Sequence, residues 1–148
     1  MAKRSVEQQR RPIAVLAFGV AAVIAAFWAA WFLHRSLVAA DTTAVYVAFE
    51  NAFPLADGWL ALLLVLAGLG LLRRWASTPY LLLASSSSGL YLFGMDVLYD
   101  LEHGIWGRGG NGLIELAINV ATLVLSVGIG RFAWVNRREL AGDGLSSR

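Results

Sequence analysis

The chain has 148 residues, the length of one domain; 58% of them are hydrophobic and only 15% are charged. This balance lies outside that of soluble globular domains and indicates an integral membrane protein. The sequence has no cysteine, which excludes disulfide bonds, thiol redox relays, iron–sulfur clusters and covalent c-type haem. The net charge of +2 comes from basic residues that flank apolar segments, so it does not indicate nucleic-acid binding.

The first apolar segment covers residues 12–33 and carries no charge. About 20 apolar residues allow a helix to cross roughly 30 Å of hydrocarbon. A signal peptide is the alternative, because VAA at residues 38–40 resembles a cleavage site, but the apolar core is longer than the usual 7–15 residues or so. We expect the dozen residues before this span to form a solvated tail. On the span itself, Ala22, Ala26 and Ala30 are expected to form a close-packing face.

The segment DTTAVYVAFENAFP, residues 41–54, is too apolar for an ordinary loop and too short to cross a membrane. Asp41 or Thr42 can cap a helix, and Pro54 would end it before the second span. Three aromatic residues would share one face of that helix: Tyr46, Phe49 and Phe53. We predict a short extracytoplasmic helix over the mouth of the bundle. An extended strand through TTAVYVAF is the competing interpretation.

Three more apolar segments follow, at about residues 55–73, 79–99 and 113–135. The predicted fold is therefore all-α: residues 1–148 form a single transmembrane domain, a four-helix transmembrane bundle. Pro79 suits the first turn of the third span. The glycine-rich stretch GRGGNG, residues 107–112, is expected to be a flexible outer connector. This layout resembles that of small four-span bacterial membrane proteins, a resemblance that rests on hydropathy alone.

The basic residues predict the orientation of the four spans. Ten of the twelve fall on one side, before the first span, after the second and after the fourth: Lys3, Arg4, Arg10, Arg11, Arg73, Arg74, Arg131, Arg137, Arg138 and Arg148. Only Arg35 and Arg108 fall on the other. Because basic residues favour the cytoplasmic side, we expect a multi-pass protein of the plasma (inner) membrane with both termini cytoplasmic. All six tryptophans lie toward segment ends, where the indole ring favours the membrane interface.

Acidic residues gather at the outer end of the third and fourth spans. With a rise of 1.5 Å per residue, Asp96 lies about 25 Å along the third span from its inner end. Asp100 and His103 follow at i+4 and i+7 on the same face, which continues inward through small residues, whereas Glu102 points elsewhere. The fourth span carries one continuous polar stripe: Glu115, Asn119, Thr122, Ser126 and Gly130.

Asp57 lies at a similar depth on the second span, and Glu50 is close by on the outer segment. Charged carboxylates that face lipid are costly, so these groups should face one another or a wet cavity. Carboxylates that are close together require protons, a basic partner or a cation. The candidate ligand-binding or cation-binding residues are Glu50, Asp57, Asp96, Asp100, His103, Glu115 and Asn119. The alternative is that they are interfacial residues satisfied by water or by other helices; we favour it for Asp100 and Glu102.

No catalytic motif is present, and no motif implies a cofactor. The sequence favours a protein that binds or transports a cation, a proton or a small polar ligand in an acidic pocket near the outer leaflet. Two other functions remain open: a membrane-embedded enzyme acting on a lipid or isoprenoid substrate, with carboxylates and His103 as acid and base, and an accessory subunit of a larger membrane complex. The expected partners are the lipid bilayer and a further copy of the chain or a larger complex, not nucleic acid.

The topology can be tested by cysteine labelling, because the natural chain has no cysteine to interfere. We expect single cysteines at Ser5, Ala76 and Leu145 to react only from the cytoplasmic side, and one at Gly110 only from the outside. Labelling of residue 110 from the cytoplasmic side alone would contradict the predicted orientation.

Overall fold

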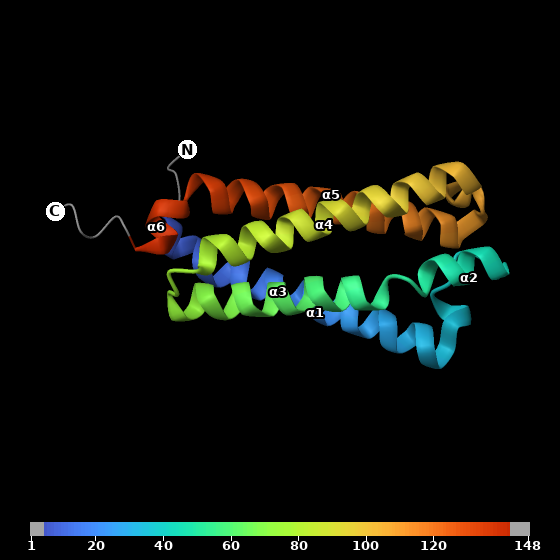
Figure 1. Cartoon of the computed structure of the whole chain (residues 1–148), viewed down its shortest axis with the longest axis horizontal. Helices are drawn as coiled ribbons and strands as arrows, with labels where there is room; N and C mark the ends of the chain where they lie inside the picture. Colours follow the sequence, from blue (N-terminus) through green and yellow to red (C-terminus); the bar gives the residue numbers. More distant parts are fainter. Residues whose placement is uncertain (1–4, 143–148) are drawn as a thin grey trace.

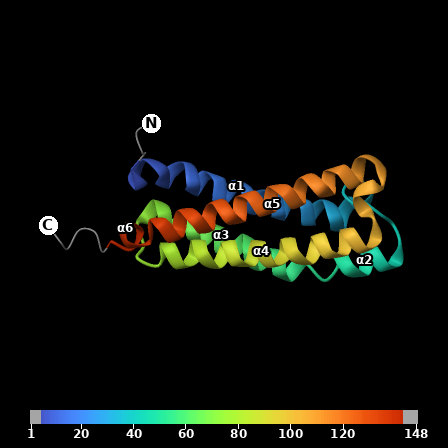
Figure 2. The same ribbon diagram turned by 90° about the horizontal axis from the view of Figure 1, so that it is seen from above.

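The computed structural model describes residues 5–142, and all regular structure in this part of the chain is helical. Four long helices run side by side: α1 (Val6–His34), α3 (Pro54–Arg73), α4 (Thr78–His103) and α5 (Gly109–Val135). The short helix α2 (Ala44–Glu50) lies at one end of the bundle and α6 (Arg137–Ala141) lies at the other (Figure 1 and Figure 2). Single turns of 3₁₀ helix, Arg35–Leu37 and Ile105–Gly107, follow α1 and α4.

The predicted all-α class is confirmed, and four helical stretches of the described residues are long and apolar enough to cross a membrane. They are Val6–Leu37, Ala44–Arg73, Thr78–His103 and Gly109–Val135. Pro54 and Pro79 each lie in the first turn of a helix, α3 and α4, where a missing N–H costs nothing.

The expectation of a solvated N-terminal tail is wrong for residues 6–11, which belong to α1. Ser5 caps the helix: its Oγ accepts a hydrogen bond from the Gln8 N–H at 3.4 Å, and the Gln8 Oε1 accepts one from the Ser5 N–H at 3.2 Å. This reciprocal capping box satisfies two backbone donors that would otherwise lack partners. Ser5 and Gln8 are the sequence signal for the start of this helix, three residues apart as a capping box requires.

The extended alternative for residues 41–54 is wrong, because Ala44–Glu50 is helical. The cap is neither Asp41 nor Thr42 but Thr43, whose Oγ1 accepts from the Tyr46 N–H at 3.4 Å. Asp41 instead accepts hydrogen bonds from Thr42 N at 2.6 Å and from Thr43 Oγ1 at 3.0 Å, which fixes the turn before the helix.

The expectation of a flexible glycine connector is wrong for residues 109–112, which form the first turn of α5. Gly112 packs directly on the preceding turn: a Cβ added there would lie 2.3 Å from the carbonyl oxygen of Ile105. Glycine is needed at this position because two backbone segments approach too closely for any side chain.

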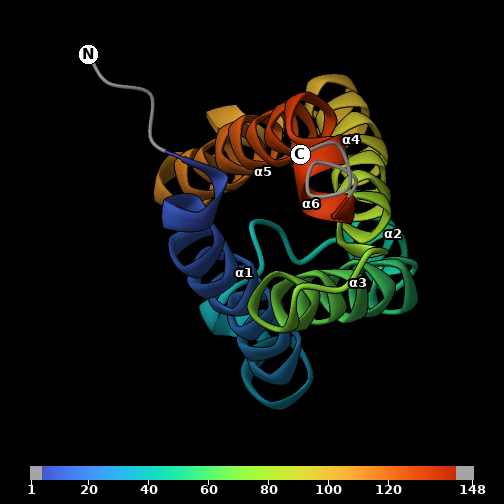
Figure 3. The ribbon, with the colours of Figure 1, turned by 90° about the vertical axis from the view of Figure 1, so that its left-hand side faces the viewer.

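The long helices pack in chain order, α1 against α3, α3 against α4, and α4 against α5. Within residues 5–142 no comparable contact joins α1 to α5, so the ring of helices seen end-on in Figure 3 has one loosely packed seam. The buried face of α1 consists of Val6, Arg10, Ala14, Ala17, Ala21, Trp28 and Trp31. The predicted alanine face is wrong, because Ala22 and Ala26 are exposed.

Two tryptophans of α1 do not act as the interfacial anchors we expected. Trp28 and Trp31 are 8% and 0% exposed, and both indole N–H groups bond inside the protein. Trp31 donates to Asn51 Oδ1 at 3.0 Å, which ties α1 to the residue that follows α2. By contrast, Trp59 and Trp134 are well exposed on the outer surface of the bundle.

Small residues bring α4 and α5 close together. The Ser86 hydroxyl of α4 donates to the Ser126 carbonyl oxygen of α5 at 2.8 Å. A Cβ added to Gly130 would lie 2.4 Å from the same hydroxyl oxygen, whereas one added to Gly128 would meet no atom within 4 Å. The serine and glycine pattern therefore produces close helix contact, as small residues do in membranes.

We expect Gly130→Ala to destabilise the protein relative to Gly128→Ala by roughly 1–2 kcal/mol, because Ser86 must give up its hydrogen bond to make room. Both substitutions gain the same helix propensity, so their difference isolates the contact. The measurement is thermal unfolding of the two purified variants in the same detergent. Equal midpoints would show that α4 and α5 are not in close contact at Gly130.

Candidate functional site

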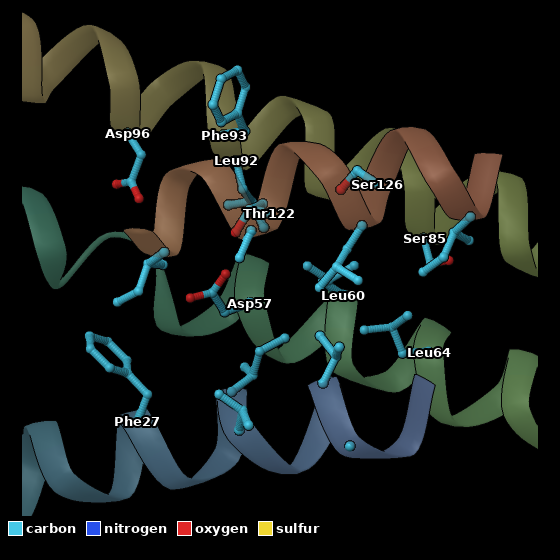
Figure 4. Close-up of a pocket in the computed structure, with 18 of the residues that line it drawn as sticks. Phe27, Asp57, Leu60, Leu64, Ser85, Leu92, Phe93, Asp96, Thr122 and Ser126 are labelled. Atoms are coloured by element: carbon cyan, nitrogen blue, oxygen red, sulfur yellow. The ribbon is translucent and has the colours of Figure 1, made fainter. Parts of the chain in front are cut away.

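A cavity of about 650 Å³ lies between the four long helices, and Glu50 at the end of α2 and Phe53 at the start of α3 also line it. Its volume lies within the range of about 300–1,000 Å³ typical of small-molecule sites. Apolar side chains form most of its wall, and the polar ones are hydroxyls and carboxylates. Figure 4 shows Asp57 and Asp96 directed into the same space from different helices, with Leu60 and Leu64 further along it.

Three carboxylates from three helices meet in this cavity. Each of Glu50 at the end of α2, Asp96 in α4 and Glu115 in α5 offers an oxygen that lies within 4.8 Å of the other two. Glu50 and Glu115 are only 6% and 7% exposed. We call these three residues the carboxylate cluster. Helical periodicity brings them together, since Glu115 belongs to the inward-facing polar stripe of α5 and Asp96 faces inward from α4.

Asp57 also lines the cavity but does not belong to the cluster. Its Oδ2 accepts a hydrogen bond from Trp28 Nε1 at 2.9 Å, so α3 and α1 are joined at this point. The sequence did not indicate this contact, because we expected Trp28 at the membrane interface. The i, i+3 spacing of Trp28 and Trp31, in line with the small residues Ala14, Ala17 and Ala21, is the signal that could have revealed a buried face.

Asp100 and Asn119 lie outside the cavity wall and bind each other. Asp100 is 2% exposed, and its Oδ2 accepts from Asn119 Nδ2 at 2.7 Å and from Trp106 Nε1 at 2.8 Å. This contact joins the end of α4 to α5 and to the 3₁₀ turn between them. Its geometry is that of a structural polar contact, which is the alternative that we favoured for Asp100. The Asn119 Oδ1 has no hydrogen-bond partner among the described residues.

His103 also lies away from the cavity, at the exposed end of α4. Its Nδ1 lies 2.9 Å from the carbonyl oxygen of Tyr99, and its ring stacks on the Tyr99 ring with a centroid distance of 4.0 Å. Tyr99 in turn stacks on Phe49 of α2 at 3.8 Å. His103 therefore extends an aromatic stack that holds α2 against α4.

An ion pair closes the same end of the molecule. Arg108 contacts Asp41 Oδ2 and also donates to the His103 carbonyl oxygen at 2.8 Å. Desolvation raises the pKa of the Asp41 carboxyl. Hydrogen bonds from Thr42 and Thr43 and the charge of Arg108 lower the same pKa by a larger amount. The net pKa lies below the ordinary value of aspartate, so this ion pair forms throughout the neutral range.

The carboxylate cluster has no basic partner within the described part of the chain. The cavity wall contains no Lys, Arg or His. In the three ion pairs between described residues, the carboxylates are those of Glu7 and Asp41, and neither belongs to the cluster. Glu115 and Asp96 accept no hydrogen bond from any described residue. Three carboxylates at this spacing are stable together only when protons or a bound cation reduce their repulsion. The arrangement can thus bind a metal ion, protons or a protonated ligand.

We expect Asp100→Ala to destabilise the protein by about 2 kcal/mol or more, because the Trp106 and Asn119 donors lose their acceptor. Glu102→Ala, at an exposed carboxylate two residues away, should change stability by less than about 0.5 kcal/mol. Thermal unfolding of both variants in detergent measures the difference. If Asp100→Ala unfolds at the same temperature as the wild type, the Trp106 and Asn119 donors are not buried against Asp100.

Comparison with known proteins yields no match: no protein-family model, no curated protein and no solved structure resembles the chain significantly. We therefore infer the function from the cavity and its carboxylates.

Proposed function

We propose that the protein is a multi-pass protein of the plasma (inner) membrane that binds a cation, or protons, at Glu50, Asp96 and Glu115. In this proposal both termini are cytoplasmic and α2 lies on the extracytoplasmic side. The cluster then sits near the outer leaflet, in a cavity that extends into the membrane.

The distribution of basic residues supports this orientation. The first residues of α1, the α3–α4 connection and α6 lie at one end of the bundle, opposite α2 (Figure 1). That end carries most of the arginines of the described residues, including Arg73, Arg74 and Arg137. The end with α2 carries Arg35 and Arg108, of which Arg108 pairs with Asp41. A positive cytoplasmic end is the usual arrangement in membrane proteins.

The single observation that carries the function is the convergence of three carboxylates within 4.8 Å without a basic partner. At that separation, two unit charges repel by about 3 kcal/mol even at an effective dielectric constant of roughly 20. A bound cation is attracted to all three carboxylates and offsets their mutual repulsion. Cation binding therefore stabilises the folded protein relative to the empty site.

The enzyme alternative has weaker support. It required His103 beside the carboxylates as an acid or base, and proton transfer requires the groups to be within hydrogen-bond reach of a common substrate. His103 stacks on Tyr99 and does not line the cavity. The titratable side chains that do line the cavity are all carboxylates.

Thermal unfolding between pH 5 and pH 8, with and without Ca²⁺ or Zn²⁺, tests the proposal. We expect a cation to raise the wild-type midpoint saturably, by about 4 °C for each kcal/mol of binding free energy. Glu50→Gln, Asp96→Asn and Glu115→Gln should each raise the midpoint without added cation, because one repulsive charge is removed. Each should also reduce the response to the cation and to pH.

Glu102→Gln is the matched control, because it removes an exposed carboxylate near the end of α4 without touching the cavity. It should behave like the wild type. If all three cluster variants also match the wild type at every pH and with every cation, the cluster does not bind cations or protons. Co-purification with a larger complex would then favour the accessory-subunit function.

A further inference from the structure

We propose that the cation is organic and amphiphilic: an alkylammonium ligand whose charged head binds the carboxylate cluster and whose chain occupies the rest of the cavity. The proposal rests on the proposed function and specifies the chemical class of the ligand.

The shape and lining of the cavity support this class. Along α5 the lining runs from Glu115 to Ile129, about 21 Å at 1.5 Å per residue. In Figure 4 the carboxylates of Asp96 and Asp57 lie in one part of the cavity, and Leu60 and Leu64 lie further along it. The hydroxyls of Ser85 and Ser86 in that part already donate to backbone carbonyl oxygens, at 2.9 and 2.8 Å. A hydrated metal ion gains nothing from contact with the apolar part of the cavity, whereas burial of an alkyl chain there is favourable.

The charged end has the features of a site for an organic ammonium group. Glu115 is 7% exposed, lines the cavity and has no hydrogen bond or ion pair with any described residue, so its carboxylate lacks a partner that a ligand would supply. The rings of Phe27 and Phe53 line the same cavity. Aromatic faces together with carboxylates are typical of sites that bind ammonium ligands.

The seam between α1 and α5 provides a path from the bilayer. These helices lack the close packing that joins the other neighbours. On the α1 side, Gly19 lines the cavity, and a Cβ added there would meet no atom within 4 Å. Val15 and Val23, which also line the cavity, are 70% and 68% exposed, so little packs over them. An amphiphile dissolved in the membrane can therefore reach the cavity sideways, with its chain among lipid tails.

The test uses the full chain purified in dodecyl maltoside, with dodecyltrimethylammonium as the probe. Tetramethylammonium has the head without the chain, dodecanol has the chain without the charge, and Ca²⁺ and Zn²⁺ are the inorganic cations. Binding is followed by thermal unfolding and by the fluorescence of the native tryptophans. We expect saturable binding of dodecyltrimethylammonium, at least about tenfold tighter than that of tetramethylammonium or dodecanol.

Two kinds of variant locate the site. Asp96→Asn and Glu115→Gln should weaken binding of the probe by about tenfold or more, because the cation loses a buried partner. Gly19→Phe should fill the cavity without a clash near the backbone and weaken binding similarly. Gly94→Phe is its matched control: a Cβ at Gly94 also meets no atom within 4 Å, and Gly94 does not line the cavity.

The outcomes separate this inference from the proposed function. If Ca²⁺ or Zn²⁺ binds at the cluster and dodecyltrimethylammonium does not, the ligand class is wrong and the cation site stands. If dodecanol binds as tightly as dodecyltrimethylammonium, the inference is also wrong. The same holds if Gly19→Phe and Gly94→Phe bind dodecyltrimethylammonium equally tightly. If the protein responds to no cation and to no change of pH, the proposed function fails as well.

Discussion

A hydrocarbon environment offers no hydrogen-bonding partner, so every polar side chain buried in a membrane-spanning bundle must find one within the protein or face a wet cavity. Four helices of the described residues are long and apolar enough for this constraint to apply, and several of their buried polar side chains have partners inside the protein. Trp28 bonds to Asp57, and Ser86 bonds to the backbone at Ser126. Asp100 accepts hydrogen bonds from Trp106 and Asn119. The carboxylate cluster differs from these pairs because Asp96 and Glu115 face the cavity and accept no hydrogen bond from any described residue, and for that reason it carries the functional proposal.

The sequence was sufficient to predict the long helices, because each follows from an uninterrupted apolar run. The ends of the helices were harder to predict. Residues 6–11 are polar and charged, and their helix depends on the Ser5 capping box and not on hydropathy. Residues 109–112 are rich in glycine, which usually indicates a connector, yet Gly112 is required there by close contact with Ile105. Local composition thus indicated that these stretches are polar or rich in glycine, but it did not indicate that they are helical.

Helical spacing was a good guide to the site where it ran along one helix and a poor one across helices. The stripe from Glu115 to Ser126 does face the interior. Depth in the membrane placed Asp57, Asp96 and Glu115 at one level, but it could not distinguish a carboxylate that already has a partner from one that lacks it. That distinction depends on Trp28, Trp106 and Asn119, which approach from other helices or from a turn. Pairings of this kind are set by rotation of whole helices about their axes, which hydropathy does not report.

The order in which the helices pack also determines how the chain can be assembled. Each span contacts the one before it, so every extensive interface closes only a short loop and costs little chain entropy. Contacts of this kind are local in sequence, and folds built from them form rapidly. Each long helix after the first therefore has an extensive docking surface on the long helix that precedes it in the chain. The interface between the first and last spans would close the longest loop, and it is the one that stays loosely packed.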